Sequence, residues 1–198
     1  MCVSQLERAD GVELTGSALW DAGLALGDYA RKLRPRLGEQ GSSAPLSVIE
    51  IGAGCGAAGL MLALGGDEIL LTDYQPEVLA LLETNVRRNW LQGCASVQKL
   101  DWNDPPSLAI ARRPWDLILC ADIIYGLPSF APLLQLLEAL CSPRTRILLG
   151  CGNKQRGSRE VGERPPVKHA PCVCGVSYRE GRGYTGIPPC RTHTVHTV

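Results

Sequence analysis

Three glycines at alternate positions, directly after a short and mainly apolar run, limit the fold of this chain more than any other feature. The run Val48–Ile51 is rich in β-branched residues and predicts a buried strand. Gly52, Gly54 and Gly56 follow it, and a helical pattern begins at Ala57. Glycine adopts positive φ values and has no Cβ atom to hold a ligand away from the backbone. This stretch therefore predicts a strand, a glycine turn and a helix that together bind a cofactor.

Strand and helix patterns alternate along the rest of the chain. This order predicts a parallel sheet with right-handed helical crossovers, which is a Rossmann-like architecture of the α/β class. The first helix is expected from Ala18 to Leu33, with Thr15 or Ser17 as its cap. The later elements are expected to be strands over residues 46–51, 68–72, 96–101, 116–121 and 145–150, and helices over residues 57–65, 76–90 and 129–141.

Acidic residues recur at or near the ends of the expected strands. Glu50, Asp73, Asp101 and Asp122 are the four that do so. In a parallel sheet the carboxyl ends of the strands face one crevice, so these carboxyl groups are expected to gather there. Asp73 could then accept hydrogen bonds from both ribose hydroxyls, and Asp101 could accept one from an adenine amino group. The indole of Trp102 could cover the face of a base.

The glycine spacing by itself does not choose between cofactors. Gly54-x-Gly56-x-x-Gly59 also fits the dinucleotide fingerprint, which leaves a nicotinamide cofactor open. However, residues 1–150 contain no histidine, which excludes a Ser-His-Asp site, a histidine zinc site and the acid–base group of many dehydrogenases from that part. Methyl transfer from a sulfonium needs no histidine, because the leaving group is already activated by its charge and the enzyme mainly aligns the reacting atoms.

Several short segments between about residues 12 and 155 resemble one known family. The matching segments are Gly16–Gly23, Val48–Gly56, Leu71–Tyr74, Thr84–Asn89, Leu100–Trp102 and Ala121–Tyr125. They are similar to the seven-β-strand S-adenosylmethionine-dependent methyltransferases, a class I methyltransferase fold. The early Trp20-Asp-Ala and the Asp-x-x-Tyr motif of Asp122 and Tyr125 narrow the resemblance to the family 16 protein-lysine methyltransferases, the methyltransferase-like 21 group.

The resemblance implies a role for each matching residue. Asp122 and Tyr125 would be the catalytic residues, at the point where the incoming amine meets the methyl group. The cofactor-binding residues would be Trp20 as a lid, Glu50, Gly52 and Gly54 beside the methionine part, Asp73 at the ribose, Asp101 and Trp102 at the adenine, and Ala121 at the end of the fourth strand. Because Asp73 is expected in an open crevice, its removal should weaken cofactor binding and barely change stability.

The expected function is S-adenosylmethionine-dependent methyl transfer to the side-chain amine of lysine in a protein substrate. The resemblance implies a chaperone or a translation factor as the kind of substrate. Desolvation beside a cationic sulfonium would lower the pKa of the lysine, so that its neutral amine could attack. Two alternatives stay open: a small-molecule methyltransferase on the same fold, and a cofactor-binding protein with weak catalysis because its C-terminal strands are lost. A nicotinamide-dependent dehydrogenase is a third.

The end of the chain departs from the family pattern. We expect a methyltransferase domain in residues 1–154 and an atypical, mobile tail rich in Gly, Pro and Arg in residues 155–198. The family would place a helix and a closing antiparallel hairpin here. The hairpin is therefore expected to be missing or altered, which would leave the strand at residues 145–150 with an unpaired edge. Within the tail only residues 172–178 have the pattern of a short strand.

Composition and charge argue against several other kinds of protein. The formal net charge is zero, so no attraction to nucleic acid or to a membrane surface is indicated. No apolar run reaches about 18 residues, and the first residues lack a signal-peptide pattern. The nine cysteines are therefore expected to be reduced thiols in a cytoplasmic protein, with a nuclear location also open. The tail contains residues of zinc-ligand type, but their spacing fits no finger pattern and no metal site is predicted: Cys172, Cys174, Cys190, His193 and His196.

Overall fold

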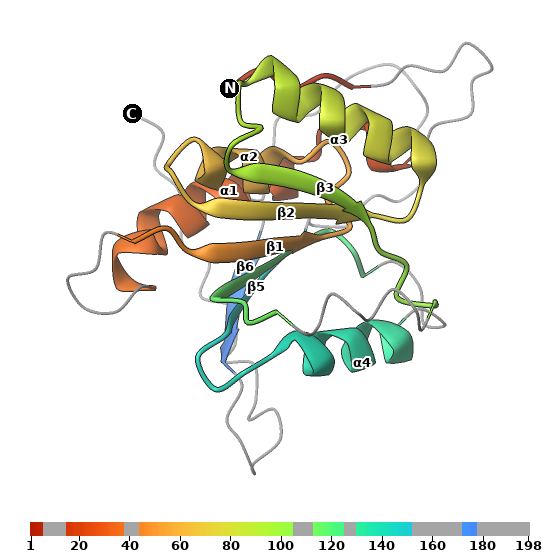
Figure 1. The fold of residues 1–198 in the computed structure, drawn as a ribbon. Coiled ribbons are helices and arrows are strands. Elements are labelled where there is room, and N and C mark those ends of the chain that lie inside the picture. Colours follow the sequence, from red (N-terminus) through yellow and green to blue (C-terminus); the bar gives the residue numbers. More distant parts are fainter. Residues whose placement is uncertain (6–14, 38–43, 105–112, 125–129, 152–171, 178–198) are drawn as a thin grey trace.

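A six-stranded sheet in the order β3-β2-β1-β4-β5-β6 forms the centre of the computed structural model (Figure 1). The strands are β1 (Ser47–Ile51), β2 (Glu68–Asp73), β3 (Ala95–Lys99), β4 (Leu117–Ala121), β5 (Arg146–Cys151) and β6 (Cys172–Ser177). The first five are parallel to their neighbours, and β6 is antiparallel to β5. The structure describes residues 1–5, 15–37, 44–104, 113–124, 130–151 and 172–177.

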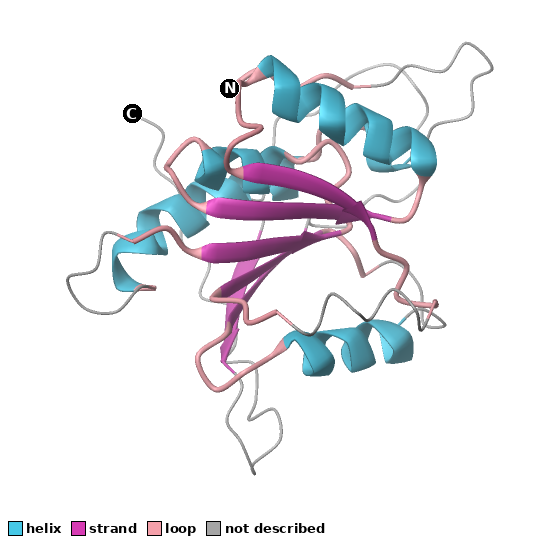
Figure 2. Ribbon diagram, in the orientation of Figure 1, coloured by secondary structure: helices cyan, strands magenta, loops and turns pink. Residues whose placement is uncertain are grey.

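Helices cover both faces of this sheet, so the architecture has three layers (Figure 2). Three of them, α1 (Asp21–Leu33), α2 (Ala57–Ala63) and α3 (Pro76–Arg88), lie on one face, and α4 (Phe130–Leu140) lies on the other. Short 3-10 helices precede and follow α1 at Thr15–Ser17 and Arg34–Arg36. Within the described ranges, no helix has the length and apolar character that a membrane crossing needs.

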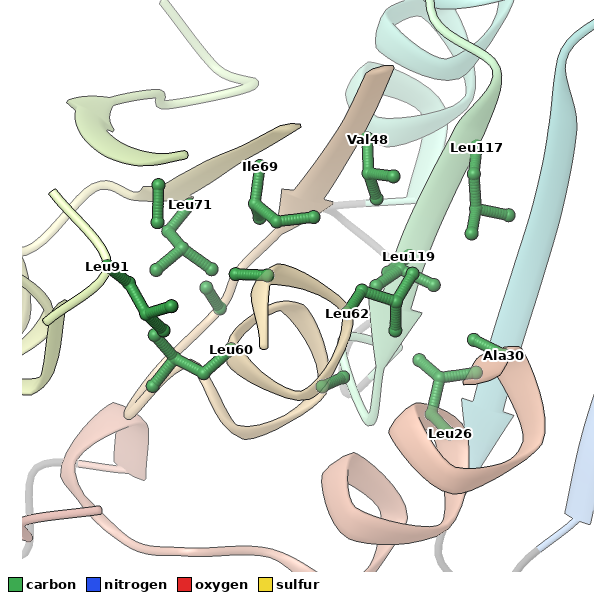
Figure 3. Packing of buried hydrophobic residues seen from close by; sticks show 14 of the residues in the cluster. Leu26, Ala30, Val48, Leu60, Leu62, Ile69, Leu71, Leu91, Leu117 and Leu119 are labelled. Carbon is green, nitrogen blue, oxygen red and sulfur yellow. The ribbon is translucent and has the colours of Figure 1, made fainter. Parts of the chain in front are cut away.

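The hydrophobic core is divided by the sheet, because side chains alternate between its two faces along each strand. Val48, Ile69 and Leu119 point to the α1–α3 face, where they pack with residues of α1 and α2 (Figure 3). Ile49 and Ile118 point to the other face, among the leucines of α4. Both faces of the central strands are therefore buried, which explains the mainly apolar runs in the sequence.

The expected α/β fold is confirmed, and most of its elements begin and end within two residues of the sequence-based ranges. One helix differs more: α1 begins at Asp21, after an extended Trp20, instead of at Ala18. Neither Thr15 nor Ser17 caps it, because both lie in the preceding 3-10 helix. The apolar residues Ala18, Leu19 and Trp20 continue the helical pattern toward the N-terminus, so the pattern could not show that this stretch lies outside α1.

The expectation of an unpaired edge on the strand at residues 145–150 is wrong. β5 pairs with β6 over its whole length, with Arg146 opposite Ser177 and Cys151 opposite Cys172. Among the described residues β6 is the one strand antiparallel to its neighbour, and a missing or altered closing hairpin stays a prediction. The rest of residues 155–198 lies outside the described residues, so the division of the chain at residue 154 stays a prediction.

The C-terminus of α3 ends in a strained turn. Trp90 has φ +59°, a left-handed conformation that glycine usually supplies after a helix. The N–H of Leu91 donates to the Val86 carbonyl (3.1 Å), and the N–H of Trp90 donates to the Arg87 carbonyl (3.1 Å). These are the two hydrogen bonds of a Schellman motif. Leu91 and Val86 are buried in the same cluster, whereas the Trp90 side chain is 88% exposed and adds little packing.

We expect Trp90→Gly to raise the free energy of unfolding by about 0.5–1 kcal/mol, since it relieves the left-handed strain and removes few contacts. Urea unfolding of the wild type and the variant measures this difference. The matched control is Gly66→Ala: Gly66 has φ +91° and open space where a Cβ would stand, so the strain alone should lower stability by about 1 kcal/mol. A Trp90→Gly variant less stable than the wild type would contradict this account of the turn.

Candidate functional site

The glycine turn after β1 has the backbone conformation that the sequence predicts. Gly52, Gly54 and Gly56 have φ values of +61°, +55° and +80°. The turn is also crowded by the protein itself, because a Cβ on residue 54 would lie 2.8 Å from the carbonyl oxygen of Gly16. A Cβ on residue 56 would lie 2.7 Å from Leu82 of α3. The glycines therefore serve close packing of three chain segments as well as any approach of a ligand.

Glu50 lies beneath this turn, on β1, and is 2% exposed. Its Oε2 atom accepts a hydrogen bond from the N–H of Gly59 in α2 (2.7 Å). A Cβ on residue 59 would lie only 2.7 Å from the same oxygen, so glycine is required there. Burial raises the pKa of Glu50 to about 8. The hydrogen bond from the Gly59 N–H opposes this rise, and the charge of Asp73 adds to the rise. Contact of Glu50 with the methionine part of a cofactor stays a prediction.

Asp73, the last residue of β2, is bonded to the glycine turn. Its Oδ2 accepts from the N–H of Gly54 (3.2 Å), and its Oδ1 accepts from the N–H groups of Tyr74 (2.8 Å) and Gln75 (3.2 Å). Burial raises its pKa, and these three bonds oppose the shift. The side chain is 6% exposed, so the expectation of an acid in an open crevice with little stability to lose is wrong. The backbone after β2 turns back over the carboxylate, which the strand pattern alone does not indicate.

Asp101 and Trp102 follow β3, at the same edge of the sheet. Asp101 Oδ1 accepts from the backbone N–H of Asn103 (2.9 Å) and from its side-chain amide (3.2 Å), which closes a tight turn. The ring of Trp102 comes within 3.8 Å of a Cβ built on Gly52. Its Nε1 atom is buried and has no hydrogen-bond partner among the described residues. The Nε1 atom of Trp115 in the core is in the same state, so this donor does not by itself indicate a ligand.

The end of β4 reaches the glycine turn from the other side. Ala121 ends the strand, and the Asp122 N–H donates to the Gly150 carbonyl (2.7 Å) at the end of the β5 ladder. Asp122 has φ +55°, which is rare for a non-glycine residue and tends to occur at functional sites. Ile123 is buried and lies 2.9 Å from a Cβ built on Gly52. Tyr125 lies outside the described residues.

The segment between the first 3-10 helix and α1 borders the glycine turn. Ser17, the last residue of that 3-10 helix, is buried, and the carbonyl of Ala18 in the segment accepts from the thiol of Cys55 (3.6 Å). The carbonyl of Trp20 accepts from the N–H groups of Gly23 (3.0 Å) and Leu24 (3.4 Å). Trp20 itself is 44% exposed. An exposed indole at this position is compatible with a lid, and that role stays a prediction.

One buried residue at this site is missing from the sequence-based set. Asn85 of α3 donates from Nδ2 to the carbonyl of Cys55 inside the glycine turn (2.9 Å). Asn85 lies in the segment Thr84–Asn89, which resembles the family. This segment contains no acid or glycine that would indicate contact with a ligand, so Asn85 was not among the predicted site residues. The helical pattern places Asn85 on the buried face of α3, where an unpaired amide would be costly, and this is the clue that it has a fixed partner.

Together these residues form a site that fits a cationic ligand. The buried carboxyl groups of Glu50 and Asp73 lie close enough that the charge of Asp73 raises the pKa of Glu50. Within the described ranges, no basic side chain forms an ion pair with either one. A ligand with a positive charge would supply the missing counter-charge. The described residues contain no group of three side chains that could hold a metal ion, and the cysteine and histidine side chains from residue 172 onward are not among those described.

Comparison with known proteins gives a consistent result. The family model described as lysine methyltransferase matches residues 5–162. The chain is 42% identical over 107 residues to protein N-lysine methyltransferase METTL21A of Danio rerio. The matched region covers 52% of this chain and 48% of the relative. It is 36% identical over 132 residues to EEF1A lysine methyltransferase 3 of Mus musculus, covering 66% of this chain and 53% of the relative. The chain thus spans 48–60% of the length of the curated relatives it matches.

Solved structures support the fold. Magnesium protoporphyrin IX methyltransferase of Synechocystis, with bound SAH, superposes with a TM-score of 0.52 at 16% identity, covering 68% of this chain and 57% of that one. At such low identity the likeness concerns the fold alone. It confirms the expected class I methyltransferase architecture and says nothing about the substrate.

We expect Asp73→Ala to weaken binding of the expected cofactor, S-adenosylmethionine, by about 1.5–3 kcal/mol through loss of a charge-assisted hydrogen bond. Because three backbone N–H groups lose their acceptor, the free energy of unfolding should also fall by about 1–3 kcal/mol. Calorimetric titration and urea unfolding measure the two effects. Asp101→Ala is the control and should lose less stability, because Asp101 is only partly buried. An unchanged dissociation constant for Asp73→Ala would remove Asp73 from the binding site.

We also expect the buried Glu50 carboxyl to make the protein without ligand less stable as the pH rises. Between the usual pKa of 4.5 and the raised pKa of about 8, the native state holds a proton that the unfolded state lacks. The free energy of unfolding should therefore fall with rising pH over this window, by up to about 1.4 kcal/mol per unit. Glu50→Gln keeps an acceptor for Gly59 and removes the titration, so its profile from pH 5 to 8 should be flatter. Parallel profiles for the two proteins, measured by urea unfolding, would contradict this assignment.

Proposed function

Because the chain belongs to the lysine methyltransferase family, we propose that it transfers a methyl group from S-adenosylmethionine to the side-chain amine of a lysine in a protein substrate. The single observation that carries this proposal is the site at the carboxyl edge of the sheet. There the glycine turn, the buried carboxyls of Glu50 and Asp73 and the ring of Trp102 come together. The turn and the carboxyls fit a flexible ligand that is cationic at one end, and the indole ring could cover the face of its base.

S-adenosylmethionine, when bound, supplies an electrophilic methyl group on a positively charged sulfur. Within the protein, Gly52 and Gly54 would let the ligand approach the backbone, with Trp102 and Ile123 forming a wall beside Gly52. A carboxylate offers about four acceptor sites, and three backbone N–H groups already occupy three of the sites of Asp73. Asp73 therefore has room for about one ribose hydroxyl instead of two, unless the turn gives up a bond. Asp101, one strand further along the sheet edge, would accept from the adenine.

The substrate amine would arrive from the end of β4. Asp122, in its left-handed conformation, would orient the amine and hold the proton that the amine loses before it attacks. Tyr125, three residues later, would add a second polar contact. Removal of water from this corner would favour the neutral amine over the ammonium ion.

A protein of the translation or chaperone machinery is the substrate class we propose. Two of the relatives are named as EEF1A lysine methyltransferase 3 and others as protein N-lysine methyltransferases. Those names support a protein substrate, and the choice among proteins rests on the resemblance. Proteins of this class reside in the cytoplasm, so we propose the cytoplasm as the compartment in which this chain acts.

We expect Asp122→Asn to reduce methyl transfer by roughly 10²-fold or more while S-adenosylhomocysteine affinity stays within a few-fold of the wild type. Asparagine tolerates the left-handed conformation, so the backbone should be preserved. The control is Asp116→Asn at the other end of β4, where the carboxyl accepts from the N–H of Ser47 (2.8 Å), far from the site edge. Radiolabelled methyl transfer into lysate protein and into the small-molecule fraction measures activity on both substrate classes.

Three outcomes of this assay argue against the proposal in different ways. Label only in the small-molecule fraction would favour a small-molecule methyltransferase. Cofactor binding without any transfer in the wild type would favour a binding protein. Equal loss of affinity and activity in Asp122→Asn would place Asp122 at the cofactor instead of at the amine.

A further inference from the structure

Two asparagines, Asn85 in α3 and Asn89 at its C-cap, hold the N-terminal segment, residues 1–5, along the helix. Asn89 Oδ1 accepts from the N–H of Cys2 (2.7 Å), and its Nδ2 donates to the carbonyl of the same residue (2.6 Å). Asn85 does the same for Ser4, with Oδ1 accepting from the N–H (2.8 Å) and Nδ2 donating to the carbonyl (3.2 Å). Arg88 adds a hydrogen bond to the Ser4 hydroxyl. Each asparagine thus pairs with one residue as a neighbouring strand would.

The spacing of these contacts follows from elementary geometry. Asn85 lies in α3 and Asn89 caps its C-terminus four residues later, which corresponds to a helical rise of about 6 Å. Cys2 and Ser4 are two residues apart in an extended chain, which is about 6.6 Å. The two distances agree, so an extended segment can use both asparagines without strain. Figure 1 shows the start of the chain, in red, running beside α3 toward the end of the sheet that carries the glycine turn.

Asn85 differs from Asn89 in one respect: it also reaches the glycine turn. Its Nδ2 donates to the carbonyl of Cys55 (2.9 Å), which lies between Gly54 and Gly56. Asn85 is fully buried, whereas Asn89 is partly exposed. One side chain therefore holds the N-terminal segment and the candidate cofactor turn at the same time.

Further contacts bring the same segment to the turn. Val3 packs against the buried cluster of Cys55, Ala57 and Leu81. Gln5 Oε1 accepts from the N–H of Leu19 (3.1 Å), which packs against that cluster. The N-terminal segment thus packs against the cluster that includes Cys55 of the glycine turn, and Asn85 is its buried polar link to that turn.

We propose that Asn85 is a positioning residue for the cofactor, through which docking of the N-terminal segment and binding of S-adenosylmethionine stabilise each other. The inference rests on the proposed function in taking this cofactor as the ligand. When Ser4 is docked, the Asn85 amide is held with Nδ2 toward the Cys55 carbonyl, and the turn stays in its binding conformation. By linkage, a ligand that selects this conformation must tighten the docking of the segment by the same factor.

Asn85→Ala and Asn89→Ala form a matched pair that tests this link. Both variants free one residue of the N-terminal segment, but only Asn85→Ala releases the Cys55 carbonyl. Calorimetric titration of the full chain with S-adenosylhomocysteine should show affinity about 5-fold to 50-fold lower for Asn85→Ala and within about 2-fold of wild type for Asn89→Ala. A purely structural role would lower the stability of both variants and leave both affinities unchanged. That result, with a wild type that binds, would overturn the inference and leave the proposed function standing.

A second measurement needs no variant, so it stands even where Asn85→Ala does not fold. Amide hydrogen exchange of the wild type should slow at Ser4 when S-adenosylhomocysteine is added. The factor should be similar to that by which docking of the segment tightens ligand binding. A further variant, Ser4→Pro, has no backbone N–H at residue 4 to donate to Asn85 Oδ1. Like Asn85→Ala, it should weaken ligand binding. Exchange at Ser4 that is unaffected by the ligand would overturn the inference. A wild type that binds no S-adenosylhomocysteine would overturn the cofactor assignment, and the inference with it.

Discussion

The buried hydrogen bond from the Gly59 N–H to the Glu50 carboxyl is the contact on which the rest of the site depends. It joins β1 to α2 directly beneath the glycine turn, and it leaves no room for a Cβ on residue 59. With the strand and the helix held this close, the intervening residues must turn sharply. Gly52, Gly54 and Gly56 supply the positive φ values that such a turn requires.

This arrangement is electrostatically unfavourable in the protein alone. Glu50 is buried with a raised pKa, and Asp73 lies near it as a second buried carboxyl group. Backbone N–H groups offset part of the desolvation, but among the described residues no side-chain cation does. Asp122 adds backbone strain at the neighbouring strand end. Costs concentrated at one edge of an otherwise well-packed sheet are typical of a site where a ligand provides the compensation.

Segments from very different parts of the sequence surround this edge. β1, β2, β3 and β4 each end there, α3 supplies Asn85, and the residues before α1 cover the turn at Gly54. The N-terminal segment is therefore part of the site's framework, although none of its residues was expected to be. β6 is the outermost strand on the side of the sheet away from β3, where it pairs with β5, so residues 172–177 also contribute to the fold.

Local patterns in the sequence determined the elements of this protein. Strands buried on both faces, such as Val48–Ile51, and the glycines after them are visible because period and residue type depend on near neighbours. The acids at the strand ends followed from the rule that parallel strands share one carboxyl edge. Only the tertiary structure decided what those acids contact. Asp73 bonds to Gly54, Glu50 to Gly59 and Asn85 to Ser4. The last two residues are 81 positions apart, and no local pattern encodes contacts of that range.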